Sequence, residues 1–404
     1  MTTTPFQRLT AALSAAVCIA TAGSAPLPAQ QTESDEYTRY ELLAPESAQF
    51  RIYYDVTATT PGARLFFNPI RKGSEASDEA VYDRMTGAAL RFTIVDGAVA
   101  RTEGFAQADL NTKYIRVELP RPVPQGGEVR LRIDKTYRDP KSYYVDQGDL
   151  VFTRSLGIKR NAVVLPLGYE VISANVPSQV LIDPEGRMLV SFINAGPDAA
   201  PLMLRARLAP RVPAGLADRV SERAAQTREI VYFLQQPETH AFDLYHDYTE
   251  SREGVDKYLN VVRAGSRVSN PSALILDTGK KLETRILKGD AITQAKLDIG
   301  EPVKPESEVV LIPFPAIQQG KSLRLRISET YTDPARYYLE GDELIWHRGF
   351  GRPFNAVVLP AGWYLTHSAV PAVVSLTEDG RVRLDFVNPR LDEIQVLVVA
   401  RRRK

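Results

Sequence analysis

The run Val129–Pro166, VRLRIDKTYRDPKSYYVDQGDLVFTRSLGIKRNAVVLP, occurs a second time at Leu323–Pro360 as LRLRISETYTDPARYYLEGDELIWHRGFGRPFNAVVLP. The two runs align without insertion or deletion at an offset of 194 residues (331 − 137). The repeat extends upstream at an offset of 192 (242 − 50), where FRIYYD from Phe50 answers FDLYHD from Phe242. A period this long indicates tandem whole domains, because solenoid repeats run to ~20–50 residues.

The length of the repeat predicts two domains, residues 38–208 and 230–401, since 404 residues exceed the usual size of a single core. Residues 209–229 are the predicted linker. Within it, Pro213–Arg228 is rich in Ala, Arg and Glu, with Leu216, Val220 and Ala224 at helical spacing, which predicts a short helix.

Each repeat alternates apolar and polar residues with a period of two. In Val129–Ile133 and Leu323–Ile327 the apolar residues share one face and the arginines the other, and Val382–Phe386 alternates in the same way. This pattern predicts strands with one face on a core and one in water. Turn signals such as Asp139-Pro140 and Asp333-Pro334 separate the strands. We therefore predict an all-β protein of two tandem, internally duplicated antiparallel β-sandwich domains joined by the helical linker.

Residues 1–30 are predicted to be a signal peptide. Arg8 gives a positive n-region, Leu9–Ala22 form an apolar segment, and Ala29 is a good cleavage position. About 14 apolar residues fall short of the ~20 that span a bilayer, so no stable membrane span is expected after cleavage. Cys18, the only cysteine, leaves with this segment, although lipidation there stays an alternative. The sequence thus predicts a secreted or periplasmic protein without disulfides.

The composition excludes some classes of partner and chemistry. The net charge is +1, which gives no electrostatic case for nucleic acid. All four histidines fall in the second repeat, and no Cys/His grouping or zinc motif is present, so neither a metal nor another cofactor is expected. Asp277-Thr278-Gly279 resembles an aspartic-protease motif, but the first repeat has Met85-Thr86-Gly87 there. A hairpin turn is the better interpretation, because that catalysis needs two carboxylates.

Aromatic residues provide the candidate binding site: Tyr144, Tyr338, Trp346, His347 and Trp363. Each Tyr-Tyr pair is expected to send one ring inward and one outward, since adjacent strand residues face opposite ways. An exposed ring could stack on a sugar or anchor a peptide, and core packing is the alternative.

Two polar pairs kept in both repeats, Arg154/Arg348 and Asn161/Asn355, are interpreted as ties for the loop at Gly157 and Gly351.

The run Tyr232–Phe242, which contains Pro237-Glu-Thr-His-Ala-Phe242, resembles the opening strands of one peptidase domain. This is the non-catalytic N-terminal β-domain of glycyl-aminopeptidase-like and leukotriene-hydrolase-like metallopeptidases. The first repeat departs from it at Ala48, where the histidine would fall, and no zinc helix follows. The resemblance implies a β-sandwich accessory unit without peptidase activity.

The sequence therefore predicts an exported, non-catalytic tandem β-sandwich protein that binds a protein or glycan partner. Two alternatives are a hydrolase with its site in the inter-domain cleft and a purely structural envelope component. Histidines and tryptophans confined to the second repeat favour a binding site in that copy.

Overall fold

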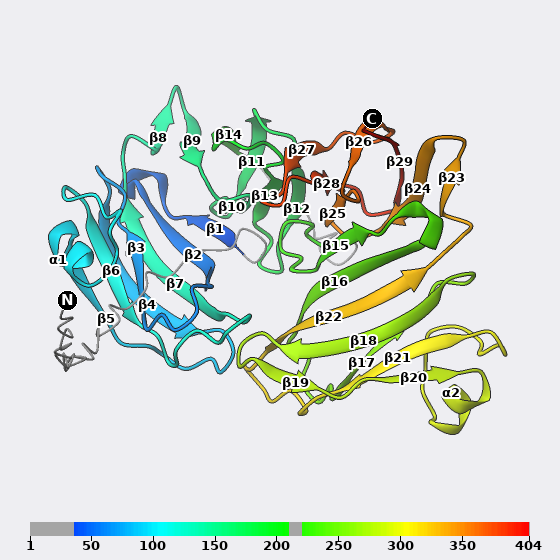
Figure 1. Ribbon diagram of the computed structural model, residues 1–404. Helices are drawn as coiled ribbons and strands as arrows, with labels where there is room; N and C mark the ends of the chain where they lie inside the picture. The colour runs from blue at the N-terminus through cyan, green and yellow to red at the C-terminus, as the bar shows by residue number, and fades with distance from the viewer. Residues whose placement is uncertain (1–35, 210–219, 404) are drawn as a thin grey trace, which may run out of the picture.

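The computed structural model describes residues 36–209 and 220–403. Almost all of the regular structure is β-strand, as the sequence predicts (Figure 1). Two groups of strands follow each other along the chain, and we name β1–β14 unit 1 and β15–β29 unit 2. The predicted signal peptide, residues 1–30, lies outside the described residues.

The elements of unit 1 are β1 (Tyr37–Leu42), the 3-10 turn η1 (Pro45–Ser47), β2 (Gln49–Ala58), β3 (Leu65–Pro69), β4 (Glu75–Asp83), β5 (Phe92–Asp96), α1 (Gly97–Thr102), β6 (Lys113–Glu118), β7 (Val129–Arg138), β8 (Tyr143–Asp146), β9 (Asp149–Leu156), β10 (Arg160–Val164), β11 (Tyr169–Ala174), β12 (Gln179–Ile182), β13 (Met188–Ile193) and β14 (Ala200–Leu208). Those of unit 2 are β15 (Glu229–Leu234), η2 (Pro237–Thr239), β16 (Ala241–Glu250), β17 (Lys257–Val261), β18 (Arg267–Ile275), β19 (Lys280–Leu282), β20 (Arg285–Lys288), α2 (Asp290–Gln294), β21 (Glu308–Pro313), β22 (Leu323–Thr332), β23 (Tyr337–Glu340), β24 (Glu343–Phe350), β25 (Phe354–Val358), β26 (Trp363–Ser368), β27 (Val373–Leu376), β28 (Val382–Val387) and β29 (Ile394–Arg402).

The strand order is the same in both units. The large sheet runs β12-β13-β10-β1-β2-β7-β4 in unit 1 and β27-β28-β25-β15-β16-β22-β18 in unit 2, where β19 adds an edge strand. The small sheets are β11-β14-β9-β8 and β3-β6-β5, answered by β26-β29-β24-β23 and β17-β21-β20. Pairing is antiparallel except for β1 with β10 and β15 with β25, which are parallel. The prediction of antiparallel sheets misses these two parallel pairs, because in each of them a long stretch of chain separates the two strands.

In each unit the two small sheets share one core with the large sheet. In unit 1 the core includes Phe50, Leu131 and Phe152, all with no exposed surface. In unit 2 it includes Phe242 and Trp346. These are inward positions of the period-two pattern, so burial of apolar surface explains why each sandwich forms.

The units pack through the same surface of each copy. Gly87 lies against the carbonyl of Gly320, and Gly279, the repeat partner of Gly87, lies against Pro124 of unit 1. Such reciprocal contacts are those of an isologous interface. The interface contradicts one prediction. Arg130 and Arg324, expected in water, have no exposed surface, because each unit covers the other there.

A buried ion pair crosses this interface. Arg130 donates from Nε to Asp277 Oδ1 at 2.7 Å and from Nη2 to Asp277 Oδ2 at 3.1 Å, and Asp277 is also buried. The backbone N–H of Arg324 donates to Asp277 Oδ2 at 2.7 Å, and Arg324 pairs with Glu128 at 3.3 Å. Asp277 stands just beyond β18 in the predicted turn, where the N–H of Gly279 donates to Ile275 O at 2.8 Å. The turn prediction is confirmed.

The described part of the linker is not helical. Residues 220–228 form a turn and irregular chain, which corrects the helix prediction for this part of Pro213–Arg228, and the rest of the predicted helix lies outside the described residues. Arg160 donates to the carbonyls of Ala224 and Gln226 at 3.2 and 2.8 Å, so tertiary hydrogen bonds replace helical ones. Arg223 donates to Gly351 O at 3.2 Å and thereby fixes a loop of unit 2.

Candidate functional site

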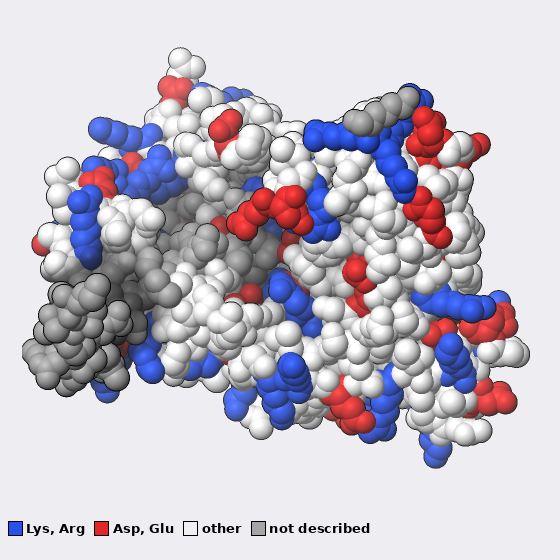
Figure 2. All heavy atoms as spheres, viewed as in Figure 1, with Lys and Arg blue, Asp and Glu red and all other residues white. Residues whose placement is uncertain are grey.

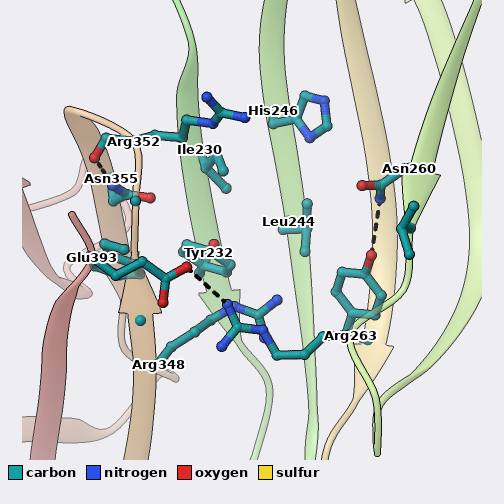
Figure 3. Close-up of a pocket in the computed structure, with 15 residues that line it drawn as sticks. Ile230, Tyr232, Leu244, His246, Asn260, Arg263, Arg348, Arg352, Asn355 and Glu393 are labelled. Carbon is teal, nitrogen blue, oxygen red and sulfur yellow. Dashed lines mark hydrogen bonds and ion pairs between the residues drawn. The ribbon is translucent and has the colours of Figure 1, made fainter. Parts of the chain in front are cut away.

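A cavity of about 320 Å³ lies in unit 2, and residues of the large sheet and of both small sheets line it (Figure 3). Strands β15, β16, β22 and β25 of the large sheet form its floor, and β17 and β24 of the two small sheets form its sides. Its lining residues are Ile230, Tyr232, Leu244, His246, Asn260, Val261, Arg263, Tyr331, Arg348, Gly349, Phe350, Gly351, Arg352, Asn355 and Glu393.

Three guanidinium groups and one carboxylate give this cavity its charge. Arg263, Arg348 and Arg352 are the cations, and Glu393 is the carboxylate, 3.8 Å from Arg263. Burial is the first cause that lowers the pKa of Arg263, and the neighbouring charge of Arg348 is the second. The guanidinium groups of Arg263 and Arg348 therefore repel each other in a partly desolvated space, where a second anion would be stabilised. We name this cavity, with the residues that line it, the cationic pocket.

Arg348 has no carboxylate partner among the described residues. Its guanidinium carbon lies 5.4, 5.4 and 5.6 Å from the ring centres of Tyr232, Phe242 and Tyr331. Aromatic faces hold a cation without neutralising it. Arg348 is thus held in place while its charge stays available.

Unit 1 shows why Arg348 is left without a carboxylate. Its repeat partner, Arg154, donates from Nη1 to Asp139 Oδ2 at 3.0 Å. In unit 2 the corresponding Asp333 accepts instead from Arg336 Nη1 at 3.1 Å, and Arg336 stands where unit 1 has Ser142. One change of residue therefore moves the carboxylate to a different arginine.

Three buried polar atoms of the cationic pocket have no hydrogen-bond partner in the described part of the chain: Nη1 of Arg348, Nε2 of His246 and Oδ1 of Asn355. Asn260, by contrast, donates to Glu329 Oε2 at 2.5 Å and to the Tyr331 hydroxyl at 3.0 Å. Buried polar atoms are nearly always paired, with protein or with water, so unpaired ones in a cavity indicate a polar occupant.

Unit 1 contains a matching cavity of about 260 Å³. Asn68, Arg71, Tyr137 and Arg154 line it at the positions of Asn260, Arg263, Tyr331 and Arg348. Other positions differ: Tyr54 replaces His246, Lys135 replaces Glu329, and Ile158 replaces Arg352. The cavity belongs to the duplicated fold, and the charges around it have diverged.

His246 gives the protein a predictable response to acid. Burial, followed by the charges of Arg228 and Arg352, lowers the pKa of His246 to about 3. An unfolded histidine binds a proton below ~6.5, so the unfolded state takes up protons between pH ~6.5 and ~3 that the folded state does not. The stability that neutral His246 contributes is therefore complete above pH ~6.5 and is lost as the pH falls toward ~3.

We expect His246→Phe to reduce the slope of unfolding free energy against pH between 6.5 and 4, measured by urea unfolding at each pH. His347→Gln is the matched control, because His347 is only half-buried and hydrogen-bonds a backbone carbonyl. An unchanged slope in the His246 variant would contradict this assignment.

The five sequence-predicted binding residues lie outside the cationic pocket. Trp346 has no exposed surface and packs against Tyr232, Phe242 and Phe350, and Trp363 is 4% exposed. Both tryptophans are core residues, which corrects the expectation that they face a ligand. Tyr144, Tyr338 and His347 are half-buried on the β8–β9 and β23–β24 hairpins. Their neighbours Tyr143 and Tyr337 are fully buried, which confirms the inward-outward prediction.

The polar pairs kept in both repeats divide into two groups. Asn161 donates to Ile158 O at 2.6 Å and Asn355 to Arg352 O at 2.9 Å, so the prediction that they tie down the glycine loop is confirmed. Arg154 and Arg348 do not tie down the glycine loop as predicted. Arg154 donates to Asp139 in the Asp-Pro turn, and Arg348 lines the cationic pocket. The recurrence of Arg, Asn and Tyr at matching positions was the sequence signal for the pocket.

No metal cluster and no membrane helix is found in residues 36–209 and 220–403. No three His, Cys, Asp or Glu side chains lie close enough together to hold a metal ion there. Within the same ranges, no helix has the length and apolar character needed to cross a membrane.

No family model and no curated protein matches the chain. Among solved structures, an aminopeptidase N family protein from Idiomarina loihiensis is 9% identical with a TM-score of 0.26, over 43% of this chain. The chain spans 29% of that protein's length. A putative protease from Parabacteroides distasonis is 10% identical with a TM-score of 0.24, over 91% of this chain and 92% of that one. A collagen adhesin from S. aureus is 8% identical with a TM-score of 0.15, over 80% and 88%. These similarities are too low to argue from.

Proposed function

We propose that this is a non-catalytic binding protein whose second unit captures an anionic group of a protein or glycan partner in the cationic pocket. The observation that carries the proposal is Arg348, an arginine without a carboxylate partner among the described residues, which lines a cavity beside Arg263 and Arg352.

The chemistry of the lining favours an oxyanion. A guanidinium presents paired N–H donors that match a carboxylate, sulfate or phosphate, and such charge-assisted hydrogen bonds are stronger than neutral ones. Asn260 adds a neutral polar group on one side of the pocket, and His246 adds another on its floor. A cavity of about 320 Å³ holds one such group with the ring or backbone that carries it. Charges of both signs lie interspersed on the face of the molecule shown in Figure 2.

The inter-unit cleft supports the hydrolase alternative less well. This cleft, of about 550 Å³, contains Asp247 and Asp385. Arg326 donates to both oxygens of Asp247 at 2.8 Å, and Arg383 donates to Asp385 at 2.7 Å. A general acid or base must present a carboxyl oxygen to the substrate, and both of these carboxylates are instead hydrogen-bonded to guanidinium groups.

We further propose that the chain is exported to the periplasm or the cell exterior. The support is the signal-like segment with Arg8, Leu9–Ala22 and Ala29. Mass spectrometry of the protein from its native cells is expected to find a mature chain that begins close after Ala29 in an exported fraction. An intact Met1 terminus in the cytoplasm would contradict export.

Calorimetric titration of the full chain tests the binding function. The probes are sodium sulfate, a uronic acid oligosaccharide, an oligo-glutamate peptide and a neutral glucose oligosaccharide. We expect saturable binding of the anions, weakened by added salt, and none of the neutral sugar. Stronger binding of the uronic acid oligosaccharide would indicate that the partner is a glycan. Stronger binding of the peptide would indicate that the partner is a protein. Silence with every anion would refute the proposal and favour a structural envelope role.

A further inference from the structure

The cavity of unit 1 is lined by a lysine, at the position that Glu329 occupies in the second repeat. Lys135, on β7, is 7% exposed and lines the cavity of about 260 Å³. Its Nζ donates to Asn68 Oδ1 at 2.6 Å and lies 5.2 Å from the centre of the Tyr137 ring. No described carboxylate forms an ion pair with it. A buried lysine is almost always paired with an acid, so this arrangement is unusual.

The surroundings of Lys135 disfavour its protonated form. Burial is the main cause, and the positive charge of Arg154 on β9 adds to it, while Glu79 on β4 opposes them with a smaller effect. Together they lower the pKa of Lys135 to about 7. Besides Arg154, the other titratable groups that line the cavity are Arg71 at the mouth and Tyr40, Tyr54 and Tyr137 in the wall. A desolvated lysine beside another cation is the known way to make an amine nucleophilic at neutral pH.

We propose that Lys135 is a carbonyl-reactive amine that forms a Schiff base with small 2-oxo acids admitted to the unit 1 cavity. The Nζ lone pair attacks the carbonyl carbon to give a carbinolamine. Loss of one water, formed from the carbonyl oxygen and two protons, leaves a C=N bond between Lys135 and the 2-oxo acid. Neither an oxidant nor a reductant is needed.

The preference for an oxo acid comes from the neighbouring guanidinium groups. Arg154 keeps further N–H donors beyond its bond to Asp139, and Arg71 is exposed at the mouth with one bond to Ser155 O at 3.1 Å. Both line the same cavity as Lys135, so they can hold a carboxylate while the adjacent carbonyl faces the amine. This activity is separate from the anion capture proposed for unit 2.

The test traps the Schiff base in the full-length protein. Pyruvate and sodium cyanoborohydride are added at pH 7, and modified lysines are mapped by peptide mass spectrometry. Lys135 is expected to be labelled at least about tenfold faster than the exposed Lys141, because the free amine is the nucleophile and burial beside Arg154 favours the free amine of Lys135. Propanal, which lacks the carboxylate, should label Lys135 more slowly than pyruvate does.

Two further measurements distinguish the reactivity of Lys135 from an effect of misfolding. The labelling rate of the unaltered protein should level off above a midpoint near pH 7 at Lys135, while that of Lys141 keeps rising. Arg71→Gln, a change at an exposed residue, should slow pyruvate labelling of Lys135 and leave propanal labelling unchanged. The proposal is overturned if surface lysines are labelled and Lys135 is not, or if pyruvate has no advantage over propanal.

Discussion

Replacing Arg348 by glutamine is expected to weaken binding of the anionic probe by about a hundredfold, because truncating one partner of a buried charge pair costs ~2–5 kcal/mol and 1.4 kcal/mol is tenfold. The glutamine keeps hydrogen-bond donors but removes the one charge in the cationic pocket that is held only by aromatic faces. Calorimetric titration with the best of the anions gives the change in Kd.

Two variants separate charge from folding in that experiment. Arg285→Gln is the matched control, because Arg285 is exposed in the same unit and pairs only with Glu283 nearby; its Kd should equal that of the unaltered protein. Arg348→Lys should lose less affinity than Arg348→Gln, since it keeps the charge but not the paired donors. If Arg348→Gln, Arg348→Lys and Arg285→Gln all bound the anion with the same Kd, Arg348 would not be part of the binding site.

Replacing Asp277 by alanine is expected to destabilise the protein by about 3–5 kcal/mol, the cost of leaving a buried charge without its partner. Asp277 accepts both hydrogen bonds from buried Arg130 and one from the backbone of Arg324. Because this ion pair crosses the interface, the loss should also separate the unfolding of the two units, seen as a second transition in urea.

The control for this prediction is Glu283→Ala. Its partner Arg285 is exposed, and surface pairs contribute only about 0–1 kcal/mol. The double change Arg130→Met with Asp277→Leu should recover much of the loss, since apolar residues can replace a buried pair. A loss below about 1 kcal/mol in Asp277→Ala would show that the interface does not depend on this pair.

The fold was predictable because it depends on patterns within each repeat. The alternation in Val129–Ile133 and Val382–Phe386 indicated strands β7 and β28, which the structure confirms. What the pattern could not indicate was the burial of Arg130 and Arg324, because the surface that covers each arginine comes from the other unit. The same reason explains the linker, where Arg160 of β10 takes the carbonyls that a helix would use.

The candidate site was predictable only in part. Its residues recur in both repeats, but recurrence alone does not distinguish a structural arginine from a binding one. Arg154 and Arg348 occupy the same position, and their different roles follow from Arg336, which takes the carboxylate of Asp333. Tryptophan was a misleading signal, because Trp346 replaces Phe152 at a core position and gains size without exposure.

The most direct test of the central claim is a crystal structure of the full chain with selenate, whose selenium gives an anomalous signal. We predict a peak in unit 2 within hydrogen-bond distance of Arg348 and close to Arg263 and Arg352, absent when Arg348 is glutamine. Selenate ordered elsewhere on the protein, with the cationic pocket empty, would contradict the account.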